Sequence, residues 1–206
     1  MSNPISYPVF RTTDPAVALR VARELVEVGD QQDVRVSVDV ELRTVREVLR
    51  IREALPDSWF RKEDAEDWAR DPSDPTGLHV GVHASELSDD PDFLSGHLPL
   101  WASMQYRPVG SIEEEFTASV GSNIGEIWWS GLIWPDAPDS NIHGEANNAR
   151  VSLLFHCRTT GLDERADDHT VLVHVLRNSH DRESEKRHAS WLAQQVGQSV
   201  IGPRQE

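Results

Sequence analysis

Residues 33–42, DVRVSVDVEL, carry the clearest periodic pattern in the 206-residue chain. Apolar and polar side chains alternate along them, with Val34, Val36, Val38, Val40 and Leu42 in one set and Arg35, Ser37, Asp39 and Glu41 in the other. Successive side chains of a β-strand point to opposite faces of a sheet, and β-branched residues favour strands. The alternation therefore predicts a strand that is buried on one face only.

The segment before this strand predicts an amphipathic helix. In TDPAVALRVARELVEVG, residues 13–29, Asp14 suits the N-cap, Pro15 suits the first helical position and Gly29 suits the end of the helix. Its apolar residues recur at helical spacing on one face: Val17, Ala18, Val21, Ala22, Leu25 and Val28.

Two more helices are expected directly after the strand. Thr44 and Glu47 have the spacing of a capping box, which predicts a helix that ends near Leu55. A short helix is expected over residues 62–70, with Trp68 on its buried side.

The remainder of the chain is rich in predicted strands. They are expected over residues 78–84, 100–107, 126–134, 150–159 and 169–177, and a closing helix over 182–196. Helices first and a run of strands afterwards are typical of an α+β fold. Short connections favour an antiparallel C-terminal meander with helices packed on one face. We expect one domain over 1–206, with a helix-rich lobe at about 1–72 and a β-rich lobe at about 73–206.

Composition limits the classes of partner. The formal net charge is -15, from 35 acidic and 20 basic residues, so direct binding of nucleic acid is disfavoured. An acidic surface suits a protein partner with a basic surface, although it is also typical of a generally acidic proteome. Cys157 is the single cysteine, and the first residues carry neither the basic nor the apolar part of a signal peptide. No apolar run is long enough to cross a membrane, so a cytoplasmic location is expected.

Three tryptophans stand close together in EIWWSGLIWPDAP, residues 126–138. If the strand continues to residue 134, Trp129 shares the apolar face with the isoleucines. Trp128 and Trp134 then share the other face with Glu126, and tryptophan is enriched at binding hot spots. The alternative is that another tryptophan, from elsewhere in the chain, packs over both rings.

Two histidines are candidates for acid–base chemistry on that same face. His156 and His174 have the strand parity of its polar residues, and they become cross-strand neighbours if the loop between them is centred near residues 164–165. Histidine titrates near neutral pH, so His156, His174 and Glu126 are the candidate catalytic residues. The alternative is that they are half-buried histidines bonded to neighbouring groups.

The long loop over residues 135–148 is a further candidate site. It carries Asp139 and His143 among several oxygen-bearing side chains, which fits a partner-binding loop or a cation site. Its spacing matches no calcium-binding loop, and an ordinary solvated loop is the alternative.

These patterns support two main functional hypotheses. The first is an acidic protein that binds another protein through a tryptophan-bearing sheet face, as immunity, inhibitor, adaptor or virion-accessory proteins do. The second is a small α+β enzyme with a histidine and glutamate cleft on that face. A metalloprotein using His143 is a third, weaker option. No nucleotide-binding, zinc-binding or nucleophile motif occurs in the sequence, so we assign no cofactor and no metal, and the oligomeric state stays open.

Overall fold

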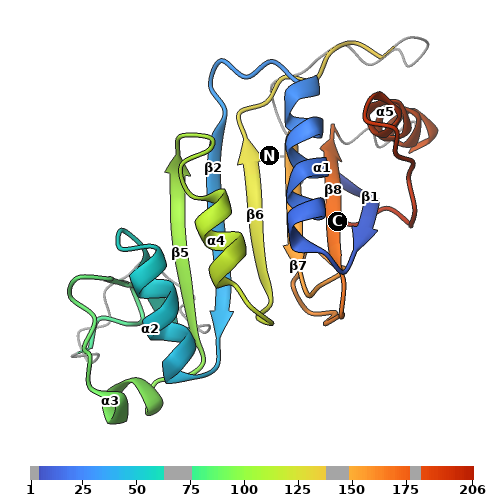
Figure 1. The fold of residues 1–206 in the computed structure, drawn as a ribbon. Helices are drawn as coiled ribbons and strands as arrows, with labels where there is room; N and C mark the ends of the chain where they lie inside the picture. The colour runs from blue at the N-terminus through green and yellow to red at the C-terminus, as the bar shows by residue number, and fades with distance from the viewer. Residues whose placement is uncertain (1–4, 63–75, 138–148, 177–181) are drawn as a thin grey trace.

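The computed structural model describes residues 5–62, 76–137, 149–176 and 182–206 (Figure 1). The strands within these ranges are β1 (Ile5–Thr12), β2 (Arg35–Leu42), β3 (Trp59–Lys62), β4 (Val82–His83), β5 (Leu100–Arg107), β6 (Gly125–Ser130), β7 (Arg150–Phe155) and β8 (His169–Val175). The helices are α1 (Pro15–Val28), α2 (Val45–Ala54), α3 (Pro91–Ser95), α4 (Glu113–Ser119) and α5 (Arg182–Gln195). The predicted α+β class is confirmed.

The strands form a single antiparallel sheet in the order β1-β8-β7-β6-β2-β5-β3-β4. Strand β2, the segment with the alternating pattern, lies inside the sheet between β6 and β5. Strands β6, β7 and β8 form the expected meander. The two predicted lobes share this sheet, because β1 pairs with β8 and β2 pairs with both β5 and β6.

All the described helices pack on one face of the sheet. Figure 1 shows α1, α2 and α4 in front of the strands, with α5 beside the β1 and β8 edge. The apolar set of β2 is buried beneath them, together with the odd-numbered residues of β6, β7 and β8. We call the opposite face the polar face; it carries Ser37, Asp39, Glu126, Trp128, Arg150, Ser152 and His174.

Local chemistry explains the two helices that the sequence predicts best. The side chain of Asp14 accepts hydrogen bonds from two backbone N–H groups at the start of α1, and Gly29 caps its end. Thr44 and Glu47 form the reciprocal capping box at the start of α2. Both predictions are confirmed, because caps depend only on residues that are neighbours in sequence.

Several predicted elements differ from the structure. The expected strand over 78–84 is reduced to Val82–His83, because the chain turns at Gly81, whose φ is 120°. Over residues 111–121 the sequence favours one helical turn followed by extended chain, whereas the structure has helix α4 over Glu113–Ser119. Of the helix expected over 62–70, Lys62 belongs to β3 instead, and Trp68 lies outside the described residues.

Strand β1 has no counterpart among the predicted elements. It contains Pro8, which removes one backbone donor, and its register with β8 shifts between Pro8 and Phe10. Proline is tolerated in a strand at the sheet edge, which is where β1 lies.

Cys157 does not share the core face of Val151, Leu153 and Phe155, although the strand parity of β7 predicts that it would. His156 has a left-handed backbone with φ of 50°, which interrupts the alternation after β7. Cys157 therefore packs with Ile124, Leu154 and Leu172 in a small apolar cluster outside the main core.

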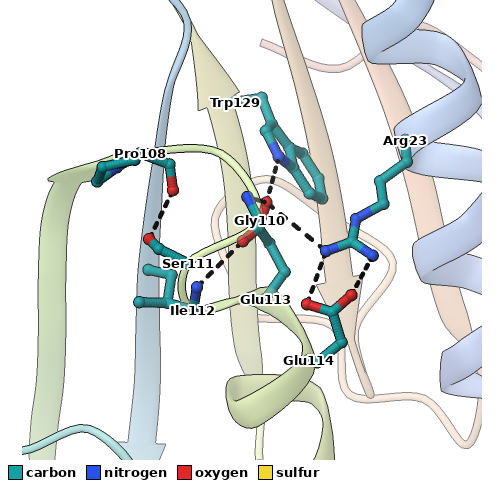
Figure 2. Close-up of polar contacts among 8 residues, drawn as sticks. All are labelled: Arg23, Pro108, Gly110, Ser111, Ile112, Glu113, Glu114 and Trp129. Atoms are coloured by element: carbon teal, nitrogen blue, oxygen red, sulfur yellow. Dashed lines mark hydrogen bonds and ion pairs between the residues drawn. The ribbon is translucent and has the colours of Figure 1, made fainter.

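A fully buried carboxylate ties the helical layer to the sheet (Figure 2). Oε1 of Glu113 accepts hydrogen bonds from the backbone N–H of Gly110 at 2.8 Å and from Nε1 of Trp129 at 3.2 Å, and Oε2 accepts one from Ile112 at 3.2 Å. The guanidinium of Arg23, on α1, lies 3.9 Å from the same carboxylate. Burying a charged group is costly unless it is paired and hydrogen-bonded, and here it is both.

Replacing this carboxylate should destabilise the fold far more than replacing its exposed neighbour. Glu113→Ala leaves the indole N–H of Trp129 and two backbone N–H groups without an acceptor, so we expect the free energy of unfolding to fall by about 3–5 kcal/mol. Glu114 also pairs with Arg23 but is largely exposed, and Glu114→Ala should cost less than about 1 kcal/mol. Urea denaturation measures both; equal losses would contradict this account of Glu113.

Candidate functional site

Three of the predicted site residues lie together on the polar face. Arg150 joins them: its guanidinium forms an ion pair with Glu126 and lies 5.0 Å from the ring centroid of Trp128. Its Nε donates to Oγ of Ser152 at 3.0 Å, and that hydroxyl is 2.9 Å from Nε2 of His174. Glu126, Trp128 and His174 therefore belong to one polar network on β6, β7 and β8.

His156 does not join this network, so the predicted pairing of the two histidines is wrong. Arg150 is the residue opposite His174, because the register pairs Leu154 with Thr170. The ring of His156 instead lies 4.7 Å from that of His169, and its Nε2 is 2.9 Å from the carbonyl oxygen of Gly121. The loop after β7 is centred several residues earlier than expected, which moves His156 beyond the end of the strand pair.

The surroundings of His174 favour a structural role. The side chain is only 4% exposed and bonded to Ser152. Burial, and then the positive charge of Arg150, hold the pKa of His174 well below its ordinary value. A neutral imidazole held within the sheet is poorly placed to exchange protons with a substrate.

Trp134 is also placed differently from the prediction. Strand β6 ends at Ser130, and Gly131 has a left-handed φ of 82°. The alternation therefore breaks: Ile133 is exposed, while Trp134 lies in the main core and its Nε1 donates to the carbonyl oxygen of His174 at 2.8 Å. Trp129 is buried in the core, as predicted.

Asp139 and His143, the two residues predicted to form a binding loop, lie outside the described residues.

The polar face contains an acidic group that sequence reasoning missed. Asp39 on β2 is paired with Glu126 on one side and with Ser103 on the other. Its Oδ1 is shielded from solvent and has no hydrogen-bond partner within the described part of the chain. Burial raises the pKa of Asp39 to about 7, with the charge of Glu126 adding to the shift and Arg61 and Arg150 opposing it. Its position in the sequence could have indicated this site, because Asp39 is a charged residue in the middle of the strand predicted over residues 33–42.

A cavity of about 600 Å³ opens on the polar face next to this acid. Its described lining comes from β3, β5 and the turn before β4, and includes Trp59, Arg61, His79, Ser103, Gln105 and Arg107. Ser103 is the cross-strand partner of both Asp39 and Trp59, so one small residue separates the acid from the tryptophan. The size is within the range of small-molecule sites.

An exposed aromatic residue is fixed beside this cavity by an irregularity in β5. The register between β2 and β5 shifts between Val36 and Val38, and Tyr106 has a left-handed φ of 57°. Its backbone N–H donates to Oγ of Ser37 at 3.0 Å. Tyr106 stands between Gln105 and Arg107, which both line the cavity. Bulges of this kind redirect side chains and are common near functional sites.

Comparison with known proteins finds no matching family model, curated protein or solved structure. Within the described ranges, no group of three or more histidine, cysteine or carboxylate side chains is arranged to hold a metal ion. In the same ranges, no helix combines the length and the apolar character needed to span a membrane.

Asp39 should make the free energy of unfolding depend on pH. Its pKa is about 7 in the folded chain against an ordinary value of 3.8, so the unfolded chain loses this proton first. Stability should therefore decrease as pH rises from about 4 to about 7, and change no further through this group above that. At pH 8 we expect the free energy of unfolding of Asp39→Asn to exceed that of the wild type by roughly 1 to 4 kcal/mol.

The comparison has an internal control. Below about pH 3, where Asp39 is protonated in both states, the two proteins should have nearly equal stability. Other titrating groups, such as His169, are common to both proteins and cancel in the difference. Urea denaturation across this pH range gives the answer, and a difference that is constant with pH would contradict the assignment.

Proposed function

We propose that the protein binds another protein through the corner of the polar face formed by Trp59 and Tyr106. The observation that carries this proposal is their exposure: 51% of Trp59 and 69% of Tyr106 are accessible, and they are the two aromatic residues among the exposed large apolar side chains of the described chain. Trp59 lines the cavity, and Tyr106 stands in the sequence between two residues that line it, Gln105 and Arg107. Tryptophan and tyrosine are enriched at hot spots, which centre on pockets that a partner fills.

The strain at Tyr106 supports a binding role for this corner. A left-handed backbone at a non-glycine residue costs about 1–3 kcal/mol, and such positions cluster at functional sites. The hydrogen bond to Ser37 holds the strained conformation in place. A rigid, exposed aromatic side chain loses little conformational entropy when a partner covers it.

Charge favours a partner with a basic surface. With a net charge of -15, the chain attracts such a protein over long range and speeds its approach. At the corner itself both signs of charge are present, because Arg107 forms an ion pair with Asp57 there. Immunity, inhibitor, adaptor and accessory proteins act by binding in this way. We place this activity in the cytoplasm, since a fold with one cysteine needs no oxidising compartment.

Trp59 and Tyr106 should determine the affinity for the partner. Trp59→Ala and Tyr106→Ala should each weaken the complex at least about tenfold, because hot-spot truncation costs about 2 kcal/mol or more. Ile133→Ala removes an exposed apolar side chain elsewhere and should leave affinity unchanged. The partner is recovered with the wild-type chain as bait, then titrated against the three variants by calorimetry. A partner that binds all of them equally would refute the proposal.

A second candidate, a small acid–base enzyme, is favoured by Asp39. Its pKa of about 7 suits proton transfer at neutral pH, and the cavity begins one residue away, at Ser103. Asp39 takes the acid–base role that the sequence suggested for His156 or His174, and Glu126 supports it because its charge helps to raise the pKa of Asp39.

The enzyme hypothesis makes a separate prediction. Turnover of a substrate should change with pH through an ionisation near 7, and Asp39→Asn should remove that ionisation and lower kcat/KM by about 100-fold or more. His174→Gln should leave the pH profile in place, because His174 lies outside the cavity lining. An unchanged profile in Asp39→Asn would exclude Asp39 as the acid–base group.

A further inference from the structure

The cavity beside Trp59 has the construction of a small-molecule site. Its walls come from three separate segments: the strand residues Trp59 and Arg61, the turn at His79, and the end of β5. Gly81, with φ of 120°, lets that turn pass close to the ring of Trp59. A volume of about 600 Å³ accommodates an aromatic ring together with a short polar chain.

Arg61 gives the cavity an available positive charge. Its guanidinium makes no ion pair or hydrogen bond within the described part of the chain, while the other lining arginine, Arg107, is paired with Asp57. Asp39 interacts with Arg61 electrostatically but not at ion-pair distance. The described lining thus carries a net positive charge in a chain whose formal net charge is -15, so it selects for an anion.

Trp59 supplies the second half of the recognition. The ring is half exposed and meets His83 edge-on, with centroids 5.5 Å apart and an interplanar angle of 80°. Trp59 and Arg61 are two residues apart on one strand, so they point to the same side with a spacing of about 7 Å. That spacing fits a carboxylate joined to an aromatic ring through a linker of two or three carbons.

We propose that this cavity binds a small aromatic carboxylate, with its ring against Trp59 and its carboxylate on Arg61. Guanidinium and carboxylate form a bidentate pair, and a face of an indole ring stacks with another aromatic ring. Ser103, the cross-strand partner of Trp59, and Gln105, two residues further along β5 and away from Arg61, provide neutral polar groups on the ring side of the cavity. This site goes beyond docking of a protein at the corner and does not depend on it.

The test uses 3-phenylpropionate as the probe, with the neutral 3-phenylpropionamide and the cationic 3-phenylpropylamine as matched compounds. Calorimetry on the wild-type chain should show the carboxylate binding at least about tenfold more tightly than the amide, and the amine most weakly, because only the carboxylate forms a charge-assisted pair with Arg61 and the amine is repelled by it. Binding of the three compounds with equal affinity, or no binding of the carboxylate at about 10 mM, would overturn the proposal.

Variants locate the site. Arg61→Gln should remove the preference for the carboxylate over the amide, and Trp59→Leu should lower the affinity for both compounds. Arg35→Gln, which changes an exposed arginine outside the cavity lining, should alter neither affinity. A carboxylate affinity that Arg61→Gln leaves unchanged would refute the assignment. Circular dichroism confirms that each variant is folded.

A spectroscopic measurement covers the case in which a variant fails to fold. The indole N–H signal of Trp59 should shift in wild-type ¹H–¹⁵N spectra as 3-phenylpropionate is added, while that of the buried Trp129 should stay in place. A shift at Trp129 without one at Trp59 would overturn the proposal. Tyr106→Ala should leave probe binding intact, so a Tyr106→Ala variant that binds both the partner and the probe as tightly as the wild type counts against the docking hypothesis and not against this site.

Discussion

The buried carboxylate of Glu113 fixes how the two layers of this protein meet. It lies at the start of α4 and accepts a hydrogen bond from the indole N–H of Trp129 on β6. It also pairs with the guanidinium of Arg23 on α1. Three elements are thereby held at one point under the helices, where no water is available to replace a lost partner. Because the described helices lie on that side, none of them covers the polar face.

Several groups on the polar face lower the stability of the folded chain. Within the described part of the chain, Asp39 has a shielded oxygen without a hydrogen-bond partner and Arg61 has an unpaired guanidinium, and Tyr106 has a strained backbone. None of these features improves packing, and all three lie at or next to one cavity. A protein gives up stability in this way where a site has to be preorganised for something it binds. Both proposals for this protein rest on the fact that these three destabilising features lie at or next to the same cavity.

The sequence predicts features that depend on parity or on near neighbours, and fails where loops set the outcome. Residues 33–42, the cap at Asp14 and the capping box at Thr44 are of the first kind. Glu126, Trp128 and His174 were placed on one face correctly although the register was wrong, because a shift by an even number of residues preserves faces. Trp134 and Cys157 were misplaced because left-handed residues, Gly131 and His156, break the alternation before them. The cavity depends on the end of β5 and on the turn at Gly81, which no periodic pattern reveals.

The pairing of β1 with β8 has a consequence for how the chain is made. Ile5 lies opposite Val175, so the first strand of the sheet hydrogen-bonds to the last one. During synthesis, residues 5–12 leave the ribosome long before their partner exists, and they remain an open strand until residue 175 has emerged. Closing so distant a contact carries a large loop entropy and makes folding slow. The nascent chain therefore has an extended period in which this first strand is open to pairing with other molecules.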